Sequence, residues 1–288
     1  MTTLAVDQEP AAALRRRFNR RSATLIVTAI AILIVFAVVA ISPIIGEAGI
    51  RSNFAERMQA PGIGHLFGTD FMGRDMLART IHGLALSLHV GLIAALLSAI
   101  VAVAFALLAA IGGRAGDMVV SFLVDATMGL PHMVLLILVA FALGGGTTAV
   151  IIAVGVTHWP RLTRILRAEM LQIRDSEYVK TSRRFGKSWL YIGYRHMLPH
   201  LVPQLLVGVI LMFPHAIMHE AGLTFLGFGL EPSRPAIGIL LAESMRYLTA
   251  GYWWLGLFPG VCLLALVLCF DVIGNGLRLL TDPHSAQE

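Results

Sequence analysis

Hydrophobic residues fall into six long segments along the chain, separated by polar connections. Most segments reach the roughly 20 apolar residues that a helix needs to cross a bilayer. The third contains Asp125 and Pro131, which helices facing a protein interior tolerate. The pattern therefore predicts an all-α fold, a polytopic membrane bundle with six transmembrane helices at 24–45, 84–112, 118–143, 147–166, 201–226 and 252–275.

The composition supports a membrane protein. Of the 288 residues, 57% are hydrophobic and 14% are charged, and the mean hydropathy is +0.78. A water-soluble core cannot bury that much apolar surface, so membrane lipid must solvate much of it. The net charge of +5 sits in blocks beside apolar segments, which indicates topology signals and no nucleic-acid partner. Cys262 and Cys269 lie seven residues apart in one apolar segment and predict neither a disulfide nor a metal site.

Lysine and arginine are unevenly distributed among the connections, which predicts the orientation of the helices. The first 23 residues carry five arginines, and the 159–200 connection carries nine basic residues. The 46–83 connection balances four basic against four acidic residues, and the 144–148 turn has no charge. We therefore expect the N-terminal tail and the 159–200 connection in the cytoplasm, and the 46–83 connection and the 144–148 turn outside. Both termini would then be cytoplasmic.

These features divide the chain into a basic cytoplasmic tail at 1–23 and a transmembrane domain at 24–288. The inner loop of this domain covers about 167–200. The first apolar segment follows five arginines and lacks a small-residue cleavage site, so we expect it to be an uncleaved anchor.

The inner loop is the most informative segment, because a connection of about 40 residues in a polytopic protein usually serves a partner. A helical run starts at Glu177, Gly186 permits a sharp reversal, and a second short helix ends at Leu198-Pro199. This predicts a helix-turn-helix elbow at 177–199. A solvated basic surface helix that obeys the positive-inside rule is the alternative.

The elbow resembles the EAA loop of ABC importer permeases. Glu177, Gly186, Leu198 and Pro199 match its pattern, whereas Thr181 and Ser182 stand where alanines are usual. In that family the loop forms the coupling helix that sits in a groove of the ATPase subunit. The resemblance implies the same role for Glu177, Thr181, Ser182, Gly186, Leu198 and Pro199.

Three further segments resemble the dipeptide, oligopeptide and nickel permeases of the same family. The run 65–75 resembles their LGTD..GRD signature through Gly68, Thr69, Asp70, Gly73, Arg74 and Asp75. The segments 224–229 and 270–278, the latter with Asp282-Pro283, resemble their SFLGLG turn and their closing motif. The glycines and the Thr-Asp pair suit a side-chain-capped turn on the outer face, where a binding protein would dock. A structural plug of that end is the alternative.

The resemblance covers nearly the whole chain from the first helix onward and implies a set of partners. This chain would form half of a translocation pathway in the bacterial inner membrane. It would pair with a second homologous permease subunit, two ATPase subunits and an extracytoplasmic substrate-binding protein.

Polar residues inside the apolar segments are candidates for the pathway, because charges in membrane helices usually face a cavity or a partner helix. They include Asp125, Glu220 and Asp271. Related permeases often carry arginine where this chain has Phe122, so Asp125 needs another partner.

Histidines suggest the cargo. His215 and His219 are four residues apart and share one helix face, with Glu220 adjacent and His158 in the preceding segment. Such a pair suits a borderline cation such as Ni²⁺ and favours the nickel or metal-chelate branch. Hydrogen bonds across helices are the alternative role for these histidines, and a di- or oligopeptide is the alternative cargo.

The chain lacks the Gly-x-x-x-x-Gly-Lys-Ser/Thr phosphate loop, so ATP hydrolysis is expected on separate subunits. No Ser/His/Asp or zinc spacing is visible, so we expect neither catalysis nor a cofactor.

A more distant alternative is an ion-coupled secondary transporter with Asp125, Glu220 and Asp271 as its relay. It would predict inverted repeats, which the two halves do not show. A non-transporting scaffold would not need these polar residues.

Overall fold

The computed structural model describes residues 12–46 and 50–281, and within these ranges the regular elements are helices with one isolated β-bridge. Asp282, Pro283 and residues 1–11 of the predicted tail lie outside the described residues. The longer helices are α1 (Ala12–Ile45), α2 (Met76–Ile111), α3 (Gly113–Met128), α4 (His132–Ala142), α5 (Gly146–Thr157), α6 (Trp159–Arg174), α9 (Leu198–Phe225) and α11 (Trp254–Thr281). The shorter ones are α7 (Glu177–Arg184), α8 (Trp189–Ile192), a π-helical turn (Gly193–Met197) and α10 (Ile237–Met245).

The long helix α2 is the centre of the bundle and packs against α5, α6 and α9. Its buried face is rich in small side chains, among them Ala94, Ala102 and Ala106, each fully buried. Small residues let membrane helices approach closely, where dispersion contacts replace the hydrophobic effect as the driving force. A Cβ added to Gly155 of α5 would lie 2.5 Å from a methyl carbon of Leu97 in α2, so this contact requires glycine.

Four helical stretches are long and apolar enough to cross a membrane: Ala23–Ile45, Met76–Ile111, Trp189–Phe225 and Trp254–Leu279. Their outward faces carry large apolar side chains, such as Leu33 and Phe36 of α1. Exposed apolar surface on this scale fits contact with lipid. The helical fold class is confirmed, with four or five candidate spans instead of six.

The segment predicted as one transmembrane helix at 118–143 is not a continuous helix. Instead, α3 and α4 meet at an angle of 94°. Pro131 supplies no backbone N–H and disfavours helical geometry at Leu130, so α3 ends before it and α4 starts after it. The predicted 147–166 segment is also divided, into α5 and α6 at His158, and Pro160 follows in the first turn of α6.

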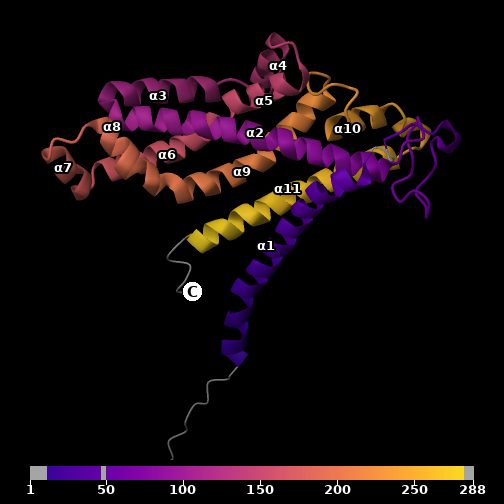
Figure 1. Ribbon diagram of the computed structural model, residues 1–288, viewed down its shortest axis with the longest axis horizontal. Coiled ribbons are helices and arrows are strands. Elements are labelled where there is room, and N and C mark those ends of the chain that lie inside the picture. Colours follow the sequence, from indigo (N-terminus) through magenta and orange to yellow (C-terminus); the bar gives the residue numbers. More distant parts are fainter. Residues whose placement is uncertain (1–11, 47–49, 282–288) are drawn as a thin grey trace, which may run out of the picture.

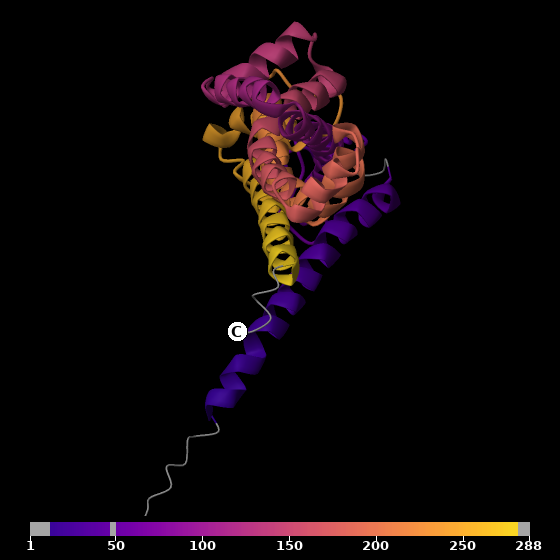
Figure 2. The same ribbon diagram turned by 90° about the vertical axis from the view of Figure 1, so that its left-hand side faces the viewer.

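The elbow and the 50–75 segment lie at opposite ends of the bundle (Figure 1). α7 marks one end, and the loop before α2 lies with α10 at the other. α1 packs on α2 and α11, and toward its N-terminus it extends away from the other helices (Figure 2).

Candidate functional sites

The elbow (residues 177–199) contains the reversal at Gly186 that its sequence predicts, but its second helix is not short, because α8 continues through the π-helical turn into α9 as one stretch from Trp189 to Phe225. α7 ends at Arg184, and Gly186 reverses the chain with a φ of +78°, a conformation that glycine adopts without strain. Ser188 then caps α8, because its hydroxyl accepts a hydrogen bond of 3.2 Å from the backbone N–H of Tyr191. α7 and α8 thus meet through a tight, capped turn.

One buried side chain and several ring contacts hold the elbow to the bundle. Val179 of α7 is fully buried in the same cluster as Ile192 and Met197. The guanidinium groups of Arg174 and Arg183 each lie 4.8 Å from the ring centre of Trp189, a cation–π arrangement. The elbow therefore moves with the ends of α6 and α9 and not as a free loop.

The residues that match the EAA pattern occupy different positions in the elbow. Glu177 is exposed and pairs with Lys180 at 2.9 Å, and Thr181 is exposed beside it. Ser182 lies 3.2 Å from His196 Nε2. Leu198 and Pro199 do not close the elbow, as the sequence suggested, but form the first turn of α9, where proline is tolerated.

At the opposite end, Asp70 organises the capped turn (residues 68–75). Its Oδ1 accepts hydrogen bonds from the backbone N–H groups of Met72 at 2.8 Å and Arg74 at 2.9 Å. Asp75 caps the start of α2 through a 2.9 Å bond from the N–H of Ala78. The indole of Trp254 in α11 donates to the carbonyl of Thr69 at 3.3 Å, which ties the turn to the last helix.

A buried ionic network connects this turn to α10. Asp70 is 1% exposed, and its Oδ2 contacts Arg74 Nε and Arg79 Nη1, both at 2.6 Å. Arg79 also contacts Glu243 of α10 at 3.0 Å. Two arginines and two carboxylates thus balance in charge, as a buried network requires. Sequence reasoning missed Glu243, which lies 164 residues from its partner.

Gly73→Ala tests how tightly this turn is built. Gly73 has a φ of +74°, and a Cβ there would lie 1.7 Å from the carbonyl oxygen of Asn53. Gly251→Ala is the matched control, because Gly251 has a φ of +91° but open space around a Cβ. Both variants carry backbone strain, and we expect the overlap at Gly73 to cost about 1–3 kcal/mol more. Thermal unfolding in detergent measures this difference, and equal melting temperatures would contradict it.

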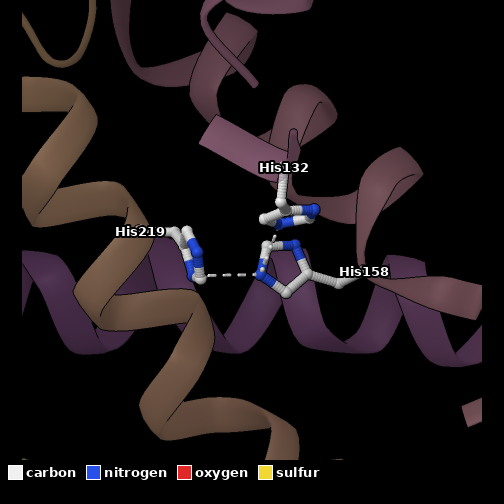
Figure 3. A group of neighbouring side chains, drawn as sticks. All are labelled: His132, His158 and His219. Carbon is white, nitrogen blue, oxygen red and sulfur yellow. Dashed lines mark hydrogen bonds between the residues drawn. The ribbon is translucent and has the colours of Figure 1, made fainter. Parts of the chain in front are cut away.

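Near the middle of the bundle, three histidine rings from different helical segments face one another (Figure 3). This histidine cluster contains His132 at the start of α4, His158 between α5 and α6, and His219 of α9. His158 Nε2 lies 3.4 Å from His132 Nε2 and 3.3 Å from His219 Nδ1. The sequence predicted a pair of His215 and His219, but His215 contributes its carbonyl oxygen to His219 and its ring is not in the cluster.

The other intramembrane polar residues have separate surroundings. Asp125 pairs with Arg164 of α6 at 2.5 Å, so the partner that its sequence context called for comes from another helix. Glu220 is fully buried and accepts a 3.0 Å hydrogen bond from Thr224. Asp271 is half-buried in α11. The structure therefore does not bring Asp125, Glu220 and the histidines together as one site.

Comparison with known proteins identifies the family. Residues 102–278 match the family described as "Binding-protein-dependent transport system inner membrane component". The chain belongs to this permease family. It is thus a multi-pass protein of the bacterial inner membrane and a permease subunit of an ABC importer.

Relatives of this permease carry names that refer to peptides. A protein of Brucella suis named as a peptide transport system permease is 36% identical over 279 residues, which cover 97% of this chain and 94% of that protein. The dipeptide transport system permease protein of Bacillus subtilis is 32% identical over 253 residues, 88% of this chain and 79% of that protein. These names do not support the nickel branch that the histidine spacing favoured.

The permease sequence gave only a weak signal for the complete histidine cluster. The sequence pointed to His158 and His219 but not to His132, because residue 132 lies inside the segment 118–143 that was expected to be one helix. The signal that would have found it is the break at Pro131, which places the first residue of α4 beside α5 and α9.

Proposed function

We propose that this permease forms half of the translocation pathway of an ATP-driven importer of di- or oligopeptides. The assignment of peptide as the cargo rests on the near full-length similarity to proteins named as peptide permeases. A second homologous permease subunit completes the pathway, two ATPase subunits drive it, and an extracytoplasmic binding protein delivers the peptide. The pathway then alternates between the two sides of the membrane.

We further propose six crossings with both termini in the cytoplasm. The pair α3 with α4, and α5 with the first half of α6 up to residue 166, each count as one crossing beside α1, α2, α9 and α11. Nine basic residues in the 159–200 connection favour the cytoplasm for the elbow. The capped turn then lies outside, because it is at the other end of the bundle (Figure 1).

The surface of the elbow supports docking of the ATPase. Phe185, Leu190 and Tyr194 are 80%, 72% and 73% exposed, at the end of the bundle where the chain is most basic. Large apolar side chains among charged ones are typical of protein interfaces, and lipid does not cover them beyond the bilayer. We propose that these side chains enter an acidic, partly apolar groove of the ATPase. ATP-driven closure of the ATPase pair then moves α6 and α9 through the elbow.

The capped turn is the proposed contact for the binding protein. Its ionic network connects Asp70 through Arg79 to Glu243 of α10, and Thr69 accepts a hydrogen bond from Trp254 of α11, so the turn is rigidly held. A rigid outer surface suits the binding protein, which must release its peptide at the outer end of the translocation pathway.

Peptide uptake by the reconstituted transporter tests the function. We expect a labelled dipeptide or tripeptide to enter proteoliposomes only when ATP, both ATPase subunits and the binding protein are present. A variant ATPase that binds ATP without hydrolysing it is the control. Uptake driven by an ion gradient without the ATPase would contradict the proposal, and uptake of nickel salt without peptide would move the protein to the metal branch.

A further inference from the structure

The histidine cluster has the geometry of a metal site. We searched the described residues for groups of at least three histidine, cysteine or carboxylate side chains whose donor atoms lie close enough to bind one ion. This cluster is the group found. One nitrogen from each ring lies within 4.8 Å of the others. The rings face one another nearly edge to face, with interplanar angles of 85°, 82° and 76° (Figure 3).

Backbone carbonyls orient two of these rings. His158 Nδ1 lies 2.9 Å from the carbonyl oxygen of Val154, and His219 Nδ1 lies 2.7 Å from that of His215. Each Nδ1–H donates to the carbonyl four residues earlier, which leaves the lone pair on Nε2. Histidines that bind metals usually donate their other ring N–H in this way, because it fixes both the tautomer and the ring.

The spacing between ring nitrogens in the cluster is compatible with binding to one tetrahedral metal ion. Two nitrogens bound at about 2.0–2.1 Å from a tetrahedral metal lie about 3.3–3.4 Å apart. His158 Nε2 and His132 Nε2 lie 3.4 Å apart, which matches this spacing. The His219 nitrogen that lies 3.3 Å from His158 Nε2 is Nδ1, whose hydrogen goes to the His215 carbonyl, so His219 would bind through Nε2. We propose that His132, His158 and His219 bind one divalent transition-metal ion of the Zn²⁺ or Ni²⁺ class.

The setting leaves one coordination position open. Imidazole nitrogens suit zinc and nickel, and three of them leave a fourth position for water or an anion. Arg161, in the first turn of α6, is close enough for its charge to act on His132 and His219. An ion beside this arginine adds to the positive charge, which favours an anionic fourth ligand such as hydroxide or a carboxylate.

The position of the site gives it a mechanical consequence. His132 follows the bend between α3 and α4, His158 lies at the break between α5 and α6, and His219 belongs to α9, which continues into the elbow. A bound ion therefore braces both breaks against α9. Metal binding holds the bundle in this arrangement. If the permease imports peptides as proposed above, the bound metal therefore slows peptide import.

Binding of cobalt to the purified permease, carried on a tag without histidines, tests the site. We expect one Co²⁺ per chain with the strong visible absorption of a tetrahedral complex, lost on addition of one equivalent of Zn²⁺. This measurement needs no variant and no transport activity. Absence of that absorption in a monodisperse wild-type preparation would overturn the proposal and leave the three rings as hydrogen-bonded packing.

Variants separate this cluster from other histidines. His132→Gln, His158→Gln and His219→Gln should each weaken zinc binding by about tenfold or more, because each removes a ligand. His215→Gln is the matched control, since it lies on the same helix and its carbonyl remains. Equal binding by His132→Gln and His215→Gln, with both variants folded, would show an adventitious ion only.

Peptide uptake with and without Zn²⁺ gives the functional readout. We expect zinc to inhibit uptake by the wild type and by His215→Gln, and to leave His132→Gln unaffected. Inhibition of all three alike would overturn the bracing role. A failure of peptide uptake without zinc would count against the proposed function alone, because the cobalt measurement stands without it.

Discussion

Replacing Arg79 with leucine is expected to lower the free energy of unfolding by about 3–5 kcal/mol, because it removes one of the two arginines that neutralise the buried network and leaves one negative charge in excess there. The Arg79 and Asp70 side chains are 3% and 2% exposed, and their contact distance is 2.6 Å. Glu243 loses its 3.0 Å contact at the same time. In detergent, the melting temperature should fall by roughly 6–12 °C or more.

Two comparisons distinguish this explanation from a general effect of losing an arginine. Arg234→Leu removes the partner of Glu231 in a loop pair whose side chains are 55% and 45% exposed, and it should cost about 1 kcal/mol or less. Adding Glu243→Gln to Arg79→Leu restores the charge balance of the buried network. The double variant should therefore be more stable than the sum of the single effects predicts. Strict additivity would contradict the charge-balance explanation.

Gly186→Pro is expected to abolish import by separating the permease from its ATPase. Proline fixes φ near −65°, whereas Gly186 has a φ of +78°, so the reversal between α7 and α8 cannot form. The exposed side chains of the elbow then lose their relative positions. We expect recovery of the ATPase with the purified permease to fall by about tenfold or more, which corresponds to a loss of about 1.4 kcal/mol in association.

Gly251→Pro is the matched control for this variant. Gly251 has a φ of +91°, and a Cβ at either position would meet open space. Each residue also donates one backbone hydrogen bond, of 2.9 Å from Gly186 to Arg183 and of 3.0 Å from Gly251 to Leu248. The two variants thus carry the same local strain at opposite ends of the bundle. If Gly251→Pro loses the ATPase equally, or Gly186→Pro retains it, the elbow is not the coupling contact.

The sequence predicted those parts of the fold that depend on local chemistry. Apolar length located the helices, and Gly186 with its flanking helical runs predicted the reversal in the elbow. Asp70 predicted a capped turn, because aspartate bonds to the backbone amides that follow it. Each of these features is determined by residues within about one turn of each other.

The sequence did not predict features that depend on distant residues or on broken helices. The 118–143 segment contains Asp125 and Pro131, but interior-facing membrane helices tolerate both residues, so the sequence did not predict the 94° bend at Pro131. The pairing of Arg79 with Glu243 and the meeting of His132 with His219 result from helix packing. His219 does contact residue 215, but its ring bonds to the backbone carbonyl of His215 and not to the His215 ring, so the two imidazoles do not form the predicted pair.

The π-helical turn at Gly193–Met197 has a consequence for chain length. The amide of Leu198 donates to the carbonyl of Gly193, five residues earlier, so this turn holds one residue more than an α-helical turn. Deleting one residue here converts the turn to α-helix and leaves the side chains on both sides in place. A deletion elsewhere in α9 would rotate every later side chain by about 100° about the helix axis. The junction between elbow and α9 is therefore a point where this chain can lose one residue and still keep its helices in register.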